Sequence, residues 1–174
     1  IGIAQTGTGK TLAFGVPLIK RLAFEKGKGL VVLPTRELAL QVDETLRQIG
    51  RTVGLRTAVL IGGESEGKQR SQLSRRPHII VATPGRLVDF LEQRQVTLGD
   101  ITILVFDEAD RMFDMGFAPQ INKILAAVPK KRQTMLFSAT MPSEIVKIAT
   151  RHMAMPVRVE VAPSGTAAKG VEQE

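Results

Sequence analysis

The chain has 174 residues, of which 43% are hydrophobic and 24% charged, and it carries a net charge of +7. This length and composition predict one globular domain of ordinary size with a full core, and no apolar run approaches the ~20 residues that a membrane span needs. The absence of cysteine excludes disulfides and thiolate metal sites and favours a reducing compartment, so we expect a cytoplasmic protein. The positive charge favours a polyanionic partner. Because Trp and Tyr are absent, a nucleic acid would be held by its backbone rather than by stacked bases.

The first eleven residues contain a short apolar run, a glycine-rich turn and then Lys10-Thr11. This layout is typical of a phosphate-binding loop, in which glycines let backbone N–H groups approach a polyphosphate and the next helix adds its dipole. Lys10 would contact the β- and γ-phosphates of ATP, and Thr11 would bind Mg²⁺. The usual first glycine is Ala4 here, and the alternative is a turn that needs glycine only for its geometry. The candidate phosphate-binding residues are Gln5, Thr6, Gly7, Thr8, Gly9, Lys10 and Thr11.

Short apolar runs alternate with helical patterns along the rest of the chain. The runs predicted as strands are residues 30–33, 58–61, 79–82, 103–106, 134–137 and 157–161. All but the last are continuously apolar, as expected of parallel strands covered on both faces, whereas the last alternates like an edge strand. Apolar residues at helical spacing predict helices over residues 38–49, after Thr83-Pro84, over 121–128 and over 145–149. The pattern predicts an α/β fold, a mainly parallel sheet with helices on both faces and ligands at the carboxyl ends of its strands.

Asp107 and Glu108 directly follow one of these predicted strands. Two adjacent carboxylates at the end of a buried strand are costly unless a cation or hydrogen bonds satisfy them. In a nucleotide hydrolase the first holds Mg²⁺, usually through water, and the second orients or deprotonates the attacking water. The alternative is a helix N-cap. Together with the upstream loop, the pair predicts that both groups converge, across adjoining strand ends, on one Mg²⁺-triphosphate.

Ser138 and Thr140 follow the next predicted strand. Their hydroxyls either bond Asp110 or its loop, which would couple the nucleotide state to the rest of the domain, or cap the helix that contains Ile145. The sequence leaves both alternatives open.

Both ends of the chain suggest that a longer protein continues beyond them. Only residues 1–3 remain of the strand that precedes a phosphate loop, so we expect the domain to begin upstream and to extend to residue 161. Residues 162–174 are small, polar and unpatterned, which is typical of a flexible linker.

Six motifs in order resemble the first RecA-like domain of DEAD-box RNA helicases, over roughly residues 1–161. They lie at residues 4–11 (motif I, including the alanine), 34–39 (Ia), 62–63 (GG), 83–86 (Ib), 107–110 (the Asp-Glu-Ala-Asp string) and 138–140 (III). The longer string over residues 111–117 is similar to bacterial members. The resemblance implies a RecA-like phosphate-loop NTPase domain that uses ATP and Mg²⁺ to unwind or remodel RNA locally, by closing with a second such domain.

The resemblance also implies roles for individual residues. The catalytic residues would be Lys10, Asp107 and Glu108. The residues that couple nucleotide state to the domain would be Asp110, Ser138 and Thr140, and Mg²⁺ would contact Thr11 and Asp107. The residues that it places along the RNA path are Pro34, Thr35, Arg36, Gly62, Gly63, Thr83, Gly85 and Arg86. For Arg36 and Arg86 the alternative is a structural salt bridge. Four further basic residues are predicted to lie in a solvated loop: Lys68, Arg70, Arg75 and Arg76.

The family's adenine-reading segment and its second domain, which supplies arginines to the transition state, are not found in this sequence. Because an arginine finger contributes on the order of 10³–10⁵ in rate, the chain alone is expected to bind nucleotide weakly and to hydrolyse it hardly at all. Alternative functions are an ATP-dependent RNA clamp or partner-docking module, a DNA translocase, and an ATPase with no nucleic-acid role. We expect a monomer without a membrane contact.

Overall fold

The computed structural model describes residues 2–3 and 8–160, with side chains from residue 9 onward. Within this part of the chain, seven strands form one parallel sheet in the order β3-β4-β2-β5-β6-β1-β7. The strands are β1 (Gly2–Ile3), β2 (Lys28–Val32), β3 (Thr57–Leu60), β4 (Ile79–Ala82), β5 (Ile101–Phe106), β6 (Gln133–Ser138) and β7 (Val159–Glu160). The predicted fold class is confirmed, and the alternating last strand lies at the edge of the sheet.

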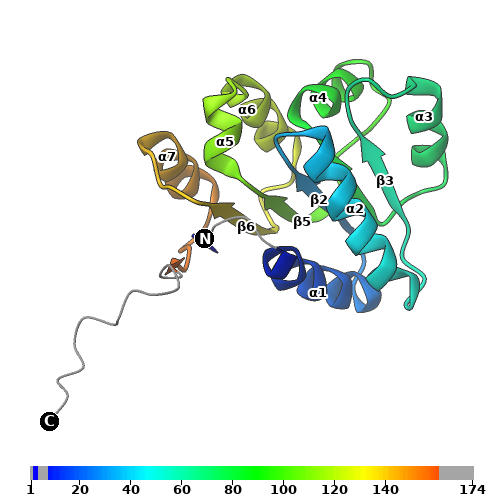
Figure 1. Cartoon of the computed structure of the whole chain (residues 1–174), viewed down its shortest axis with the longest axis horizontal. Coiled ribbons are helices and arrows are strands. Elements are labelled where there is room, and N and C mark those ends of the chain that lie inside the picture. The colour runs from blue at the N-terminus through cyan, green and yellow to red at the C-terminus, as the bar shows by residue number, and fades with distance from the viewer. Residues whose placement is uncertain (1, 4–7, 161–174) are drawn as a thin grey trace, which may run out of the picture.

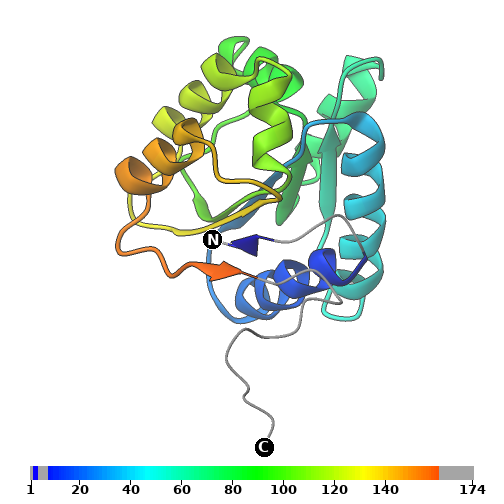
Figure 2. The same ribbon diagram turned by 60° about the vertical axis from the view of Figure 1, so that its left-hand side comes forward.

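Helices cover both faces of this sheet (Figures 1 and 2). They are α1 (Thr8–Phe24), α2 (Arg36–Arg51), α3 (Glu66–Ser74), α4 (Pro84–Glu92), α5 (Ala109–Asp114), α6 (Ala118–Ala127) and α7 (Ser143–His152). Neighbouring residues of a strand pack into the hydrophobic cores on opposite faces of the sheet. Val31 of β2 and Val105 of β5 pack with α1 and α2, while Leu30 and Leu104 of the same strands pack with α4 to α7. Continuously apolar strands are therefore required. No helix in the described ranges is long and apolar enough to cross a bilayer.

The sequence did not predict helix α3, and it indicated α5 only through the alternative that Asp107 and Glu108 form a helix N-cap. The prediction that Lys68 and Arg70 lie in a loop is wrong, because residues 66–74 form a helix. The four basic side chains predicted to be solvated are nevertheless exposed. The helix escapes detection because its apolar residues do not repeat at helical spacing, and its one buried side chain, Gln69, is polar.

Gln69 and Gln72 tie α3 to the free edge of β3. The N–H groups of Val59 and Ile61 donate to the side-chain oxygens of Gln72 (2.8 Å) and Gln69 (3.2 Å), and the Gln69 amide donates back to the carbonyl of Ile61 (2.9 Å). An edge strand otherwise leaves such groups unpaired. These bonds also hold the chain immediately before Gly62 and Gly63.

Gln69→Ala is expected to lower the free energy of unfolding by about 2–4 kcal/mol, because two buried backbone groups of Ile61 lose their partner. Chemical denaturation of the 174-residue chain measures this loss. Arg70→Ala, on the exposed side of the same helix, is the control and should change stability by less than about 0.5 kcal/mol. Equal effects of the two substitutions would contradict the assignment.

Candidate functional site

Lys10 and Asp107 meet at the carboxyl ends of the strands. The Nζ atom of Lys10, in the first turn of α1, lies 2.8 Å from Oδ1 of Asp107, and both side chains are less than a tenth exposed. The expectation that the two strand ends adjoin is wrong: β6 pairs with both β1 and β5 and lies between them. The lysine side chain nevertheless brings its ammonium group to the carboxylate, so the two predicted groups share one site.

The rest of the phosphate-binding loop is only partly visible. Gln5, Thr6 and Gly7 lie outside the described residues, and Thr8 is placed only as the first residue of α1. At Gly9 an added Cβ would meet nothing within 4 Å, so the first turn of α1 faces open space. The unpaired N–H groups and the dipole of such a turn form an anion-binding surface.

Glu108 has an unusual backbone conformation beside Asp107. It is 7% exposed and lies in the left-handed region, with φ 52° and ψ 50°, which is uncommon for a residue with a side chain. It precedes α5 at the cap position but makes no side-chain cap bond. Its carboxylate lies 3.3 Å from Arg111, and its N–H donates to Asp107 (2.9 Å). Glu108 therefore occupies the helix-cap position without forming the cap hydrogen bond. Left-handed backbone conformations of residues other than glycine are frequent at functional sites.

Ser138 and Thr140 both contact Asp110. The N–H of Asp110 donates to the Ser138 hydroxyl (3.1 Å), and the N–H and hydroxyl of Thr140 donate to the Asp110 carboxylate (3.0 and 2.9 Å). Helix α7 instead begins after Pro142 with no side-chain cap. Of the two alternatives, the structure contains the contact with Asp110, which joins the end of β6 to α5. Whether this contact couples nucleotide state stays a prediction.

The hydrogen bonds to Asp110 also change its titration. Burial alone would raise the pKa of Asp110, but bonds with Thr140, Ser138 and the Arg111 N–H outweigh it and hold the pKa below 3.8. A carboxyl group with a lowered pKa stabilises the folded state above its unfolded pKa. That stabilisation is lost as the pH falls through the folded value.

Thr140→Val is therefore expected to reduce stability by about 1 kcal/mol at neutral pH, with the difference from the parent chain shrinking as the pH falls below 3.8 and through the lowered pKa of Asp110. Denaturation curves between pH 7 and pH 2.5 test this. Thr150→Val is the control, since that hydroxyl bonds the neutral carbonyl of Val146 and its effect should not vary with pH. A Thr140→Val effect that is constant with pH would exclude the charge interaction.

A second cluster lies where β2, β3 and β4, neighbours in the sheet, reach their carboxyl ends. An open groove of about 470 Å³ lies there, and it is lined by Pro34, Thr35, Arg36, Gly62, Thr83, Gly85, Arg86, Asp89, Met115 and Phe117. Gly63 adjoins it, with φ +72° and the Arg36 guanidinium so close that a Cβ would lie 1.9 Å from it. All eight residues assigned to the RNA path thus come together.

The two arginines of this groove differ in their partners. Arg86 forms an ion pair with Glu66 (3.2 Å) and lies over the ring of Phe90, so the salt-bridge alternative applies to it. Arg36 is exposed and has no acidic partner within the described ranges. Thr35 caps α2 by accepting from the N–H of Leu38, whereas the Thr83 hydroxyl makes no such bond at α4.

Sequence reasoning missed two groups around this groove. Met115 and Phe117 line it, and Glu66 holds Arg86 from α3. No spacing rule pointed to Glu66, because α3 itself was not predicted. Met115 and Phe117 lie between α5 and α6, and only the packing of that segment brings them to the groove.

The described residues contain no group of three or more acidic, His or Cys side chains that would hold a metal by itself. The site offers the Asp107 carboxylate and the Thr11 hydroxyl in the turn beside it. An oxygen set this small fits Mg²⁺, which keeps several waters and takes its remaining ligands from phosphates.

Comparison with known proteins gives concordant results. Residues 1–148 match the family model "DEAD/DEAH box helicase". The ATP-dependent rRNA helicase RRP3 of Yarrowia lipolytica is 50% identical over 92% of this chain and 34% of its own length. The DEAD-box ATP-dependent RNA helicase CshA of Bacillus subtilis is 45% identical over 99% of this chain and 35% of its own. The chain therefore spans about a third of the length of these relatives, one of which is fungal and the other bacterial.

Solved structures agree with the fold. The crystal structure of a hypothetical ATP-dependent RNA helicase from Sulfolobus tokodaii aligns with a TM-score of 0.85 and 40% identity, over 92% of this chain and 47% of that one. The yeast DEAD-box splicing factor Prp28 aligns with a TM-score of 0.84 and 33% identity, over 95% of this chain and 42% of that one.

Proposed function

The chain belongs to the DEAD/DEAH box helicase family, and we propose that it is the ATP-binding half of an ATP-dependent RNA helicase. The observation that carries this proposal is the buried contact between Lys10 and Asp107, which unites the phosphate-binding turn with the acidic motif. The RNA-path residues lie at the carboxyl ends of strands in the same sheet, so one domain face offers both sites.

In this proposal the ATP phosphates bind at the first turn of α1, and Lys10 exchanges the Asp107 carboxylate for the β- and γ-phosphates. Thr11 and Asp107 are the residues that would hold Mg²⁺, which neutralises phosphate charge when bound. Glu108, adjacent in the chain and buried, orients the attacking water and accepts its proton.

RNA would bind in the groove through its sugar-phosphate backbone. The groove offers glycine backbone, threonine hydroxyls and the unpaired Arg36, which suit phosphates but carry no sequence code. Unwinding would therefore be local and not sequence-specific. A second RecA-like domain of the same protein, closing over both sites, would supply the missing arginines. We also propose a monomer that works in the cytoplasm.

RNA-stimulated ATPase activity of the full-length protein, with and without the region after residue 161, tests the proposal. We expect stimulation by RNA but not by DNA of the same sequence, and a loss on the order of 10³ or more without that region. Equal stimulation by DNA would favour a translocase, and indifference to nucleic acid a plain ATPase. Either result overturns the proposal. Long-lived RNA clamping without strand separation would favour the clamp or docking module.

Glu66→Gln is expected to raise the RNA affinity of the full-length protein about two- to fivefold, because it releases Arg86 for a phosphate. Fluorescence anisotropy with labelled decauridylate measures it. Glu64→Gln is the matched control. It removes the same charge two positions earlier in the chain, where Glu64 pairs with the exposed Lys68. If both variants gain equally, the effect is one of net charge and not of Arg86.

A further inference from the structure

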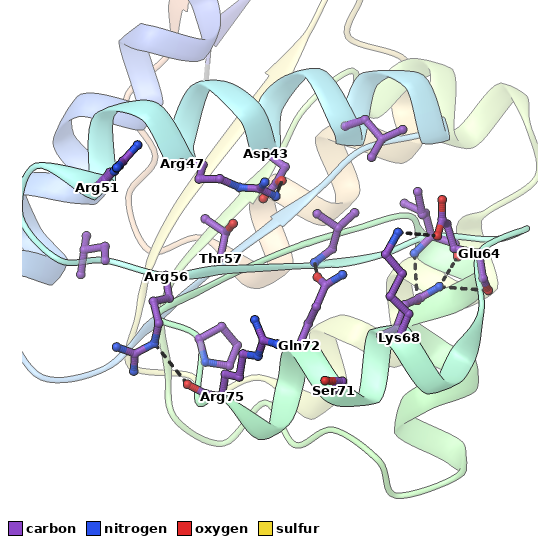
Figure 3. A pocket seen from close by; sticks show the side chains of 16 residues that line it. Asp43, Arg47, Arg51, Arg56, Thr57, Glu64, Lys68, Ser71, Gln72 and Arg75 are labelled. Atoms are coloured by element: carbon purple, nitrogen blue, oxygen red, sulfur yellow. Dashed lines mark hydrogen bonds and ion pairs between the residues drawn. The ribbon is translucent and has the colours of Figure 1, made fainter.

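A further cavity shares no lining residue with the RNA groove or with the Lys10–Asp107 site. It lies between α2 and α3, with β3 along its floor, and has a volume of about 630 Å³ (Figure 3). Cavities of this size accept small ligands or a few residues of a peptide. No step of ATP binding or RNA binding proposed above uses it.

One buried carboxylate in this cavity lacks a partner. Asp43 is only 3% exposed; its Oδ2 accepts from Arg47, but its Oδ1 has no hydrogen-bond partner. A buried, unpaired carboxylate oxygen is costly. Oδ1 exposes less than 1 Å² of surface, so a ligand in the cavity reaches it only when the Asp43 side chain turns outward, and an N–H or O–H group placed against it then removes that cost.

One end of the cavity is positively charged. Arg51, Arg56 and Arg75 lie toward this end, whereas Glu64 and Lys68 pair with each other at the opposite end (Figure 3). Arg56 donates to the carbonyls of residues 75 and 76, both at 3.2 Å, which leaves its charge uncompensated. Within the described ranges Arg51 and Arg75 have no acidic partner. This end therefore attracts anionic groups.

The floor of the cavity is apolar and contains no aromatic ring. Leu55, Val59 and Ile61 line it and are each less than a tenth exposed. The cavity therefore offers no aromatic ring on which a nucleic-acid base could stack. Aliphatic side chains need no polar partner and are compatible with such a floor.

We propose that this cavity docks an acidic peptide segment of a partner protein. Carboxylates of the segment pair with Arg51 and Arg75, an aliphatic side chain covers the floor, and a backbone N–H donates to Oδ1 of Asp43 once that side chain turns toward the cavity. Arg36 at the start of α2 belongs to the RNA groove, and Arg51 at its end lies roughly 22 Å away at 1.5 Å per residue. The charged end of the cavity is therefore distant from the RNA groove, whereas Ile61 and Glu64 at its other end flank Gly62 and Gly63.

The test begins with a phage library of random dodecapeptides selected on the full 174-residue chain. The enriched peptides are synthesised with a fluorescent label, and their affinities are measured by anisotropy. Acidic peptides with aliphatic residues should be enriched. Arg51→Ala/Arg75→Ala should weaken their binding by about tenfold, since two exposed charge pairs contribute up to about fivefold each. The melting temperature of this variant should be unchanged, because both side chains are exposed.

Lys130→Ala/Lys131→Ala is the matched control, since it removes the same charge from exposed positions outside the cavity. It should weaken peptide binding less than twofold. Neutral or basic enriched peptides, or equal losses in the two double variants, overturn the proposal. Labelled decauridylate is measured in parallel. If the cavity variant weakens RNA binding more than peptide binding, the cavity is an extension of the RNA site and the peptide proposal is wrong.

Discussion

Glu108→Gln in the full-length protein is expected to lower ATP turnover by about 10²–10⁴-fold, because the amide cannot accept the proton of the attacking water. The substitution preserves side-chain size, and Asp107 retains its contacts with Lys10 and with the N–H of residue 108. Nucleotide affinity should therefore change by less than about threefold. Single-turnover hydrolysis and equilibrium binding of a fluorescent ATP analogue separate the two effects.

Asp114→Asn provides the control for Glu108. Asp114 is an exposed carboxylate at the end of α5, so its loss removes the same charge from the same helix region without touching the site. Its turnover should match that of the parent protein. Wild-type turnover in Glu108→Gln, or equal losses in both variants, would remove Glu108 from its assigned role.

Breaking the pair between Lys10 and Asp107 is expected to destabilise the nucleotide-free chain by about 3–5 kcal/mol in Lys10→Ala, because a buried carboxylate loses its cation. Asp107→Asn added to Lys10→Ala should restore part of that loss. A double-mutant cycle measured by chemical denaturation yields the coupling free energy. In the full-length protein, Lys10→Ala should also abolish ATP turnover.

The ion pair between Lys28 and Asp100 supplies the comparison. Its atoms lie 2.7 Å apart, about as close as in the first pair, but its side chains are 31% and 48% exposed. Solvent screening should limit its coupling to about 1 kcal/mol or less. If the two cycles give the same coupling, Lys10 is not held in a buried site, and the convergence of the two motifs is not established.

The sequence by itself determined the sheet and the chemistry of its ends. Continuous apolar runs of strand length, such as residues 79–82, have few stable arrangements other than parallel strands covered on both faces. Likewise, Lys10 after glycines and two carboxylates after a buried strand predict a nucleotide site. The glycines let backbone N–H groups approach a phosphate, and the buried carboxylates are costly without a cation or hydrogen bonds. These inferences rest on local patterns, which consecutive residues of the sequence define without reference to the rest of the fold.

Only the tertiary structure decided which groups meet. It places β6 between β1 and β5 and pairs Arg86 with Glu66. Ser138 and Thr140 form hydrogen bonds with Asp110 and do not cap α7. It also builds α3 around Gln69, whose partners lie on β3. Each of these contacts joins segments that are separate in the chain. Their free energy depends on packing across the sheet, which no local spacing of residues records.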